Sequence, residues 1–127
     1  MTDEELMRLA ILEAKLSNEP LKCGVVIAMN GKVITKTYNS QRKDNNATFH
    51  AEIKAIGMAG KLLKSKNLNG CIAYCTCEPC IMCKTALFFA KIEKIYYGSG
   101  LKNKRVGDVS MIKNFLVNEC DGINNEV

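Results

Sequence analysis

Apolar and polar positions follow a helical period at the start of the chain. Between Leu6 and Leu16, apolar residues recur at spacings of three and four, which predicts an amphipathic helix ending at about Ser17. Thr2, followed three positions later by Glu5, has the pattern of a capping box, in which each side chain bonds the other residue's backbone N–H. The pattern therefore predicts that the chain opens with a capped helix.

The next segment has the pattern of two strands joined by a tight turn. Residues 23–29 are almost all small or β-branched, which is typical of a strand covered on both faces. Residues 32–38 alternate polar with apolar side chains, which is typical of a strand with one covered face. Between them, Asn30 and Gly31 both tolerate a positive φ, and this pair is the strongest short signal for a hairpin turn.

The rest of the chain alternates helices with strands. The predicted elements are a helix from His50 through Leu63, a strand over 71–77, a helix from Pro79 to about Ala90, a strand over 94–98, a helix from Asp108 through Val117 and a frayed tail over 122–127. This order predicts a single α/β domain over residues 1–127, with a mixed sheet and helices on its faces. The connection between the last two strands has the length of a right-handed crossover.

Composition narrows the class of protein. A chain of 127 residues with 47% apolar and 24% charged residues suits one globular domain. It contains no apolar run near the ~18 residues of a membrane span, and its acidic start does not resemble a signal peptide, so we expect a cytoplasmic location and no membrane contact. The net charge of +5 would help binding to nucleic acid, although a mildly basic protein explains it as well.

Cysteine usage points to a metal rather than to disulfides. The chain has seven cysteines, an odd number, and we expect no export. Cys80 and Cys83 lie three positions apart at a predicted helix start, where two thiolates on one face converge near the positive end of the helix dipole. His50, the only histidine, completes a set of three ligands, as in a catalytic zinc site with one open position. Glu52 is placed to act as a general acid and base beside that Zn²⁺.

Two other metal sites fit less well. Cys77, Cys80 and Cys83 match the first three positions of a bacterial iron–sulfur motif, but Leu87 stands where the fourth cysteine would be. A structural zinc site that added Cys75 would need four ligands within nine residues, which strand and helix geometry scatters. We expect Cys77 to end its strand beside the site without binding the metal. The remaining cysteines are interpreted as small buried apolar residues, namely Cys23, Cys71, Cys75 and Cys120.

The motifs His50-Ala51-Glu52 and Pro79-Cys80-Ile81-Met82-Cys83 resemble the zinc-dependent cytidine deaminase-like superfamily. The resemblance extends to about Gly98 and is closest to the branch that holds guanine deaminase and tRNA adenosine deaminase. It implies a three-layer α-β-α sandwich with a mixed central sheet of about five strands, and a homodimer. It also implies that Glu52 shuttles protons and that two residues contact the substrate base, Asn39 by a hydrogen bond and Ala51 by its backbone N–H. Phe49 departs from the pattern of that branch, and we expect its ring to stack on the base.

The function that this resemblance implies is hydrolytic deamination of a nucleobase or nucleoside by a zinc-activated water, with release of ammonia. Guanine is the first choice of substrate, ahead of cytosine or an adenine-type base. The alternative is a tRNA adenosine-to-inosine deaminase, supported by the net charge and by Lys102, Lys104 and Arg105. We interpret these three residues as a solvated basic loop in preference to an RNA contact. A second alternative is a non-catalytic zinc module that binds nucleic acid or a partner, against which the intact Glu52 argues.

Overall fold

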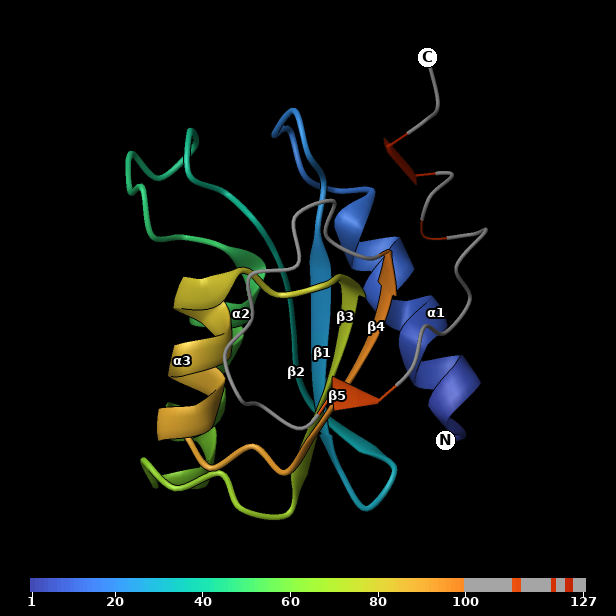
Figure 1. Ribbon diagram of the computed structural model, residues 1–127, viewed down its shortest axis with the longest axis vertical. Coiled ribbons are helices and arrows are strands. Elements are labelled where there is room, and N and C mark those ends of the chain that lie inside the picture. The colour runs from blue at the N-terminus through green and yellow to red at the C-terminus, as the bar shows by residue number, and fades with distance from the viewer. Residues whose placement is uncertain (100–110, 113–119, 121–122, 125–127) are drawn as a thin grey trace.

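One mixed sheet separates two helical layers (Figure 1). The computed structural model describes residues 1–99, 111–112, 120 and 123–124. The helices are α1 (Asp3–Ala14), α2 (Ala51–Leu63) and α3 (Ile81–Phe89), and the strands are β1 (Gly24–Met29), β2 (Lys32–Tyr38), β3 (Cys71–Cys77), β4 (Lys94–Ser99) and β5 (Met111–Ile112).

The sheet has the order β2-β1-β3-β4-β5. β1 pairs antiparallel with both β2 and β3, whereas β3–β4 and β4–β5 are parallel pairs. The α3 crossover connects β3 to β4 in parallel, as the pattern predicted. The predicted α-β-α sandwich with a mixed sheet of about five strands is confirmed, with β5 reduced to two residues.

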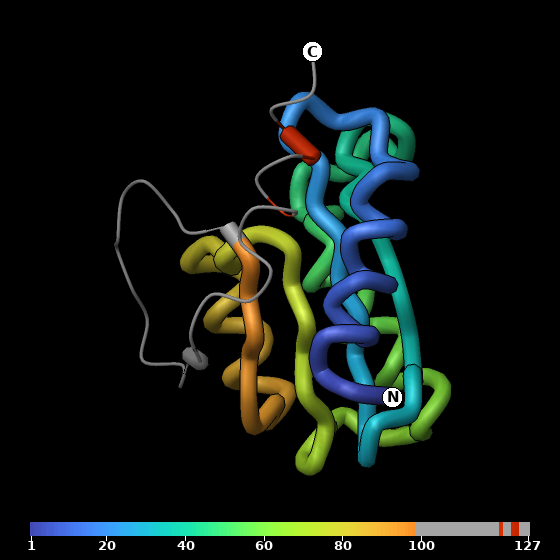
Figure 2. The backbone as a smooth tube through the Cα atoms, turned by 90° about the vertical axis from the view of Figure 1, so that its right-hand side faces the viewer, coloured from blue at the N-terminus to red at the C-terminus, as the bar shows by residue number. Residues whose placement is uncertain are grey.

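α1 covers one face of the sheet (Figure 2). The predicted capping box is present, because Thr2 Oγ1 accepts from the Glu5 N–H at 3.1 Å and Glu5 Oε1 accepts from the Thr2 N–H at 3.0 Å. The helix buries the apolar residues Leu6, Met7, Ala10, Ile11 and Ala14. It lies directly on β1 at Gly24, where an added Cβ would collide with the backbone carbonyl of Ala10. This close packing requires glycine at position 24.

The hairpin between β1 and β2 turns where predicted. Asn30 and Gly31 have φ values of +52° and +75°, the left-handed values that a tight hairpin turn demands. Beyond the turn the register shifts by one residue between Ile27 and Ala28, and this shift places Gly24 opposite Tyr38 at the far end of the hairpin. Residues that follow Tyr38 are therefore delivered next to the start of β1, which is where the candidate site lies.

α2 and α3 cover the opposite face. α2 packs small side chains on the sheet, since Ala51, Ala55 and Ala59 are all fully buried. They meet the alternate residues Cys71, Ala73 and Cys75 of β3 in one core cluster. Because small residues let a helix approach closely, the starts of α2 and α3 come together beside the end of β3 (Figure 1).

The structure corrects two predictions in the carboxyl-terminal part. Met111 and Ile112 form strand β5 on β4 instead of a helix, because backbone pairing with Ile95 and Tyr96 satisfies their hydrogen-bonding groups; the rest of that predicted helix lies outside the described residues. Residues 123–124 are helical and docked rather than frayed, since Asn124 Oδ1 accepts from the Lys22 N–H at 2.8 Å. Among the described residues, none of the helices combines the length and apolar character that crossing a membrane requires.

Candidate active site

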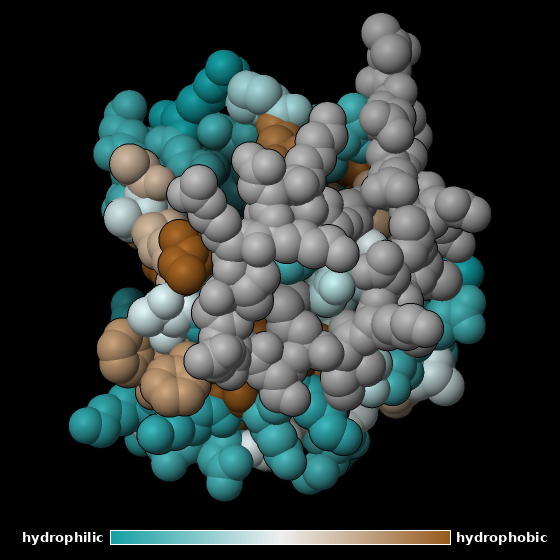
Figure 3. All heavy atoms as spheres, in the orientation of Figure 1, coloured by the Kyte–Doolittle hydropathy of each residue, from teal (hydrophilic) through white to brown (hydrophobic). Residues whose placement is uncertain are grey.

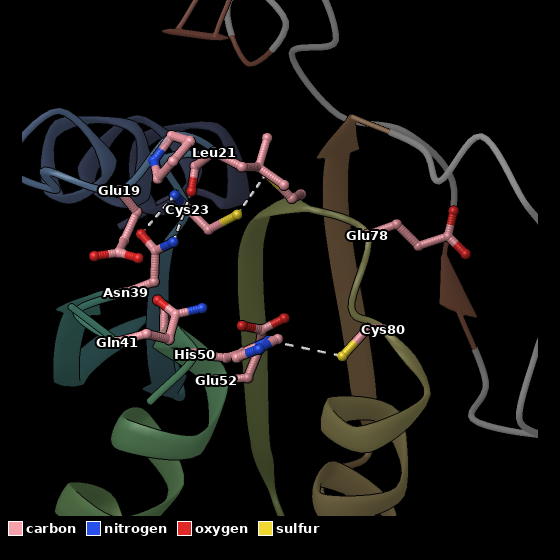
Figure 4. A pocket seen from close by; sticks show the side chains of 12 residues that line it. Glu19, Leu21, Cys23, Asn39, Gln41, His50, Glu52, Glu78 and Cys80 are labelled. Atoms are coloured by element: carbon pink, nitrogen blue, oxygen red, sulfur yellow. Dashed lines mark hydrogen bonds between the residues drawn. The ribbon is translucent and has the colours of Figure 1, made fainter. Parts of the chain in front are cut away.

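Two helix starts face each other across the end of β3. His50 is the N-cap of α2 and Cys80 is the N-cap of α3, and neither side chain makes a capping hydrogen bond. Both side chains are therefore directed at one another, with Cys80 Sγ 3.7 Å from His50 Nδ1 (Figure 4). α3 begins at Ile81 rather than at Pro79, so that the proline precedes the helix and the cysteine caps it.

The predicted metal ligands form one group. The ligand atoms of His50, Cys80 and Cys83 all lie within 4.8 Å of one another. Around one tetrahedral zinc, ligand sulfur and nitrogen atoms are separated by about 3.5–3.8 Å, given Zn–S and Zn–N bonds of about 2.3 and 2.0 Å. One imidazole with two thiols is a donor set that zinc prefers, and three protein ligands leave a fourth position for water. The residues present therefore fit zinc.

The two thiols of the ligand group differ in pKa. The pKa of Cys80 is lowered to about 5, first because the Cys83 side chain hydrogen-bonds to it. Backbone N–H groups at the start of α3 and the nearby His50 add to this effect. The pKa of Cys83 is raised, because it keeps the proton of that hydrogen bond and is buried beside Glu52. Cys80 is therefore the thiolate that is ready to bind a cation.

Glu52 is the second residue of α2, in the first turn of the helix and two positions after His50. Only 5% of the residue is exposed, and burial raises the pKa of its carboxyl from 4.5 to about 7. A side-chain hydrogen bond with Cys83 opposes that rise in pKa. A carboxyl group whose pKa lies near neutrality can both accept and return a proton, which is the property of a general acid and base.

A cavity of about 340 Å³ opens beside this group. That volume lies within the range of about 300–1,000 Å³ typical of small-ligand pockets. Its lining residues come from four segments of the chain, namely Glu19, Pro20, Leu21, Cys23, Asn39, Gln41, His50, Ala51, Glu52, Cys77, Glu78 and Cys80 (Figure 4). The cavity thus exposes the predicted proton carrier and two of the predicted metal ligands to a bound molecule.

Asn39 is part of the cavity wall and also holds it in place. Its Oδ1 accepts from the Cys23 N–H at 3.0 Å, and its Nδ2 donates to the Leu21 carbonyl at 2.6 Å. An amide oxygen has two lone pairs and an amide nitrogen has two hydrogens, so each atom can make one more hydrogen bond. Asn39 can therefore contact a ligand while it fixes residues 21–23.

Ala51 and Phe49 differ in their relation to the cavity. Ala51 is the first residue of α2 and lines the cavity, and a residue at that position has no partner for its N–H within the helix. Phe49 was expected to stack on a base, but it is not among the lining residues. Its backbone is tied to the preceding loop, since its N–H donates to Asn46 and its carbonyl accepts from Ser40. We therefore drop Phe49 from the proposed substrate contacts.

Sequence reasoning missed several residues of the cavity wall. Cys23 was interpreted as a buried small residue, yet it is half-buried and lines the cavity. Its Sγ lies 2.8 Å from that of Cys77, which is outside the group of metal ligands, as expected. Glu78 also lines the cavity. It is buried and accepts from Lys84 Nζ at 2.9 Å, with its side chain directed away from His50 (Figure 4).

Residues 1–99 match the family described as the cytidine and deoxycytidylate deaminase zinc-binding region. The chain belongs to this family of zinc-dependent deaminases. Zinc is thus the metal of the family, in agreement with the donor set described above. The motifs that indicated the family lie within the matched residues.

Relatives within the deaminase family fall into two groups by name. The chain is 41% identical over 95 residues to the tRNA-specific adenosine deaminase of Agrobacterium fabrum, covering 73% of this chain and 62% of that protein. It is 40% identical over 113 residues to the enzyme of the same name from Aquifex aeolicus, covering 87% and 74%. It is 33% identical over 98 residues to the guanine deaminase of Bacillus subtilis, covering 77% and 62%.

Two solved structures of deaminases resemble this chain over most of its length. A structure from a study of A-to-I editing by tRNA:A34 deaminases superposes with a TM-score of 0.84 at 30% identity, covering 94% of this chain and 98% of that chain. The guanine deaminase of Bacillus subtilis superposes with a TM-score of 0.74 at 33% identity, covering 79% and 66%. The guanine deaminase likeness is thus the less extensive of the two.

Proposed function

We propose that this chain is a zinc-dependent hydrolytic deaminase that converts adenosine to inosine in tRNA. The observation that supports this choice of substrate is the structural likeness to the tRNA:A34 deaminase chain, which spans 98% of that chain at a TM-score of 0.84. Sequence similarity supports the same choice, since the tRNA-specific adenosine deaminases quoted above reach 40% and 41% identity against 33% for the guanine deaminase. This reverses the order of substrates that the sequence motifs favoured.

The charge at the cavity mouth is consistent with a nucleic-acid substrate. Gln41 lines the cavity, and the next two residues, Arg42 and Lys43, are both exposed. Cations beside a base-sized cavity can contact the phosphates of a strand whose base is turned into the cavity. The net charge of +5 acts in the same direction.

The proposed roles follow from where each group lies. His50, Cys80 and Cys83 hold zinc, which when bound supplies an activated water. Glu52 takes a proton from the attacking group, delivers it to a ring nitrogen of the base and protonates the departing amine. Asn39 and the Ala51 N–H hold the base in the cavity by hydrogen bonds. The products are a base carbonyl and ammonia.

The test is an ammonia-release panel with the zinc-loaded chain. The substrates are a tRNA with adenosine at the wobble position, free guanine, free cytosine, free adenine and their nucleosides. We expect inosine in the tRNA, and binding that weakens steeply with salt because phosphate contacts release counterions. Ammonia from guanine with none from tRNA would establish the second candidate, a guanine deaminase, which the likeness to the Bacillus subtilis enzyme favours. Zinc-loaded protein that deaminates none of these would support a non-catalytic zinc module.

The metal assignment makes a separate prediction. Cys83→Ser removes one of two thiolates, so we expect the purified variant to lose stoichiometric zinc, measured by elemental analysis. Cys71→Ala is the matched control, because Cys71 lies in the core beneath the same helices and outside the ligand group. It should keep one zinc per chain. Full zinc content in folded Cys83→Ser would remove Cys83 from the ligand set.

We also propose that two copies of the chain associate through α2 and α3. Large apolar side chains are exposed on these helices, at Met58, Leu62, Ile81, Phe88 and Phe89, and apolar residues gather over α3 in Figure 3. Phe89 is 73% exposed and stands beside a groove of about 630 Å³ between the two helices. A protruding aromatic ring and a groove on one face complement each other in a symmetric dimer.

The dimer can be tested at Phe89. Phe89→Asp places a charge in the proposed contact, so we expect a monomer by light scattering at a concentration where the parent chain is a dimer. Leu12→Asp is the control, because Leu12 is 57% exposed on α1, on the opposite face of the sheet. A parent chain that is monomeric, or a Phe89→Asp variant that remains dimeric, would contradict this interface.

A further inference from the structure

A pair of thiols lies in the cavity wall, apart from the group of metal ligands. Cys23 Sγ and Cys77 Sγ are 2.8 Å apart, and both residues line the cavity. Neither belongs to the ligand group of His50, Cys80 and Cys83. The mechanism proposed above uses neither sulfur.

Strand register brings these two cysteines together. In the antiparallel pair of β1 and β3, Val25 faces Cys75 and Val26 faces Tyr74. Continued by two residues beyond Val25, the same register places Cys23 directly opposite Cys77. Residues directly opposite in an antiparallel pair have Cα atoms about 4.5–5.5 Å apart, within the range of about 4.4–6.8 Å that a disulfide spans. The backbone therefore already has the geometry of a cross-strand disulfide.

Both backbones are held in that position. The Cys23 N–H donates to Asn39 Oδ1, and the neighbouring Gly24 N–H donates to Thr76 Oγ1 at 2.9 Å. The first contact ties Cys23 to the residue after β2, and the second ties the start of β1 to the end of β3. An S–S bond is about 2.05 Å long, so closing it moves the sulfurs together by only about 0.8 Å.

We propose that Cys23 and Cys77 form a reversible disulfide site that reacts with small two-electron oxidants of the hydroperoxide class. The oxidant reaches the sulfurs through the cavity that both residues line. The inference does not depend on the substrate of the enzyme, because its primary measurement is the state of the two sulfurs.

The reaction balances with one hydrogen peroxide. Cys77 sulfur attacks a peroxide oxygen and the O–O bond breaks, so that Cys77 becomes a sulfenic acid and the departing hydroxide leaves as water with the proton that Cys77 gives up. Cys23 sulfur then attacks the sulfenyl sulfur, forming the S–S bond and expelling the hydroxyl group, which leaves as a second water with the Cys23 proton. Two thiols are oxidised by two electrons in total and the peroxide is reduced by two.

The roles of the two sulfurs follow from their hydrogen bond. The Cys23 thiol donates to Cys77 Sγ, and this bond together with burial raises the pKa of Cys23. Cys23 therefore keeps its proton, while Cys77 presents the lone pair that attacks. Cys23 is then in place to resolve the sulfenic acid at once, which favours the disulfide over further oxidation.

To test this, the zinc-loaded full chain is treated with a small excess of hydrogen peroxide, and its intact mass and zinc content are measured. Fragmentation of linked peptides then identifies which two sulfurs are joined. We expect a loss of two hydrogens, a Cys23–Cys77 link that dithiothreitol reverses, and unchanged zinc. The link closes a loop between residues 54 positions apart. The oxidised chain should therefore unfold at a temperature higher by at least about 5 °C.

Two variants separate this site from general oxidation. Cys71→Ala lacks a buried cysteine of β3 and should form the same link. Cys23→Ser removes the resolving thiol, so Cys77 should instead accumulate as a sulfenic acid that dimedone traps. Should Cys23→Ser fail to fold, alkylation of the parent chain in denaturant before and after peroxide decides, since Cys23 and Cys77 alone should become protected by the oxidation. A Cys80–Cys83 link with zinc release, or a parent chain whose Cys23 and Cys77 remain alkylatable after peroxide, would overturn the proposal.

Discussion

The Glu52→Gln variant is expected to bind zinc stoichiometrically and to lose at least about 10²–10⁴-fold in turnover, the usual contribution of a positioned acid and base. Glutamine has the shape of glutamate but cannot accept and return a proton. Glu52 is only 5% exposed and burial raises the pKa of its carboxyl to about 7, so no solvent group can substitute for it at that point of the cavity. The measurements are inosine formation or ammonia release, together with zinc content.

Stability distinguishes loss of chemistry from loss of structure in this variant. Burial raises the pKa of Glu52 from 4.5 to about 7, so in the metal-free chain its ionisation disfavours the folded state as pH rises through that interval. At about 1.4 kcal/mol per pH unit, the cost reaches about 3 kcal/mol above pH 7. Glutamine does not ionise, so metal-free Glu52→Gln should be the more stable protein at pH 8 and should lose this advantage at pH 4.

The exposed Glu93 supplies the matched control. Glu93→Gln makes the same chemical change in the loop before β4, outside the cavity. It should keep both turnover and the pH dependence of stability. A zinc-loaded Glu52→Gln that remains active would disprove the proposed role of Glu52 as proton carrier.

Local patterns predicted the parts of the fold that depend on local rules. The hairpin at Asn30 and Gly31 follows from backbone freedom at two adjacent positions, and β2 and β3 have the predicted bounds. The ligand group follows from cysteine spacing at a helix start, because a three-residue step returns to the same helix face. For His50 to join the two cysteines, the two predicted helices that carry these residues only had to lie side by side.

Features that depend on distant contacts were not predictable in the same way. β5 exists because Met111 pairs with Ile95, which no local propensity encodes. The pairing of Cys23 with Cys77 depends on the register between two strands more than fifty positions apart. Once the strands are aligned from Val25 opposite Cys75, however, that pairing follows by counting. Cys23 and Cys77 could therefore not be placed together from the sequence, because the register of their strands was unknown.

The second large effect is expected at Lys84, where tertiary contact overrides the usual preference of a charge for solvent. Lys84 is fully buried on α3 and pairs with Glu78, whose side chain is 7% exposed. Lys84→Met keeps the length of the side chain and removes its charge, which leaves the buried carboxylate without this partner. We expect the free energy of unfolding to fall by about 3–5 kcal/mol, measured by urea denaturation of the zinc-free chain.

The exposed pair of Arg8 and Glu4 is the control for that experiment. Their nitrogen and oxygen atoms are also 2.9 Å apart, but their side chains are 48% and 55% exposed. Arg8→Met should therefore change stability by no more than about 1 kcal/mol. The double variant Lys84→Met with Glu78→Gln should recover much of the loss, because no buried charge remains. A loss at Lys84 no larger than that at Arg8 would show that burial does not strengthen the pair.

The position of the Lys84–Glu78 pair extends its effect to the metal. Glu78 stands two residues before Cys80 and Lys84 directly follows Cys83, so the ion pair ties the two ends of the segment that carries both thiols. Outer groups that orient metal ligands typically contribute about 10–100-fold to metal affinity. Lys84→Met should therefore weaken zinc binding, measured by competition with a chelator under conditions where the variant is still folded. Arg8 lies on α1, far from the two thiols, so Arg8→Met should leave zinc affinity unchanged. A difference in zinc affinity between the two variants would therefore measure the contribution of the buried ion pair to the metal site.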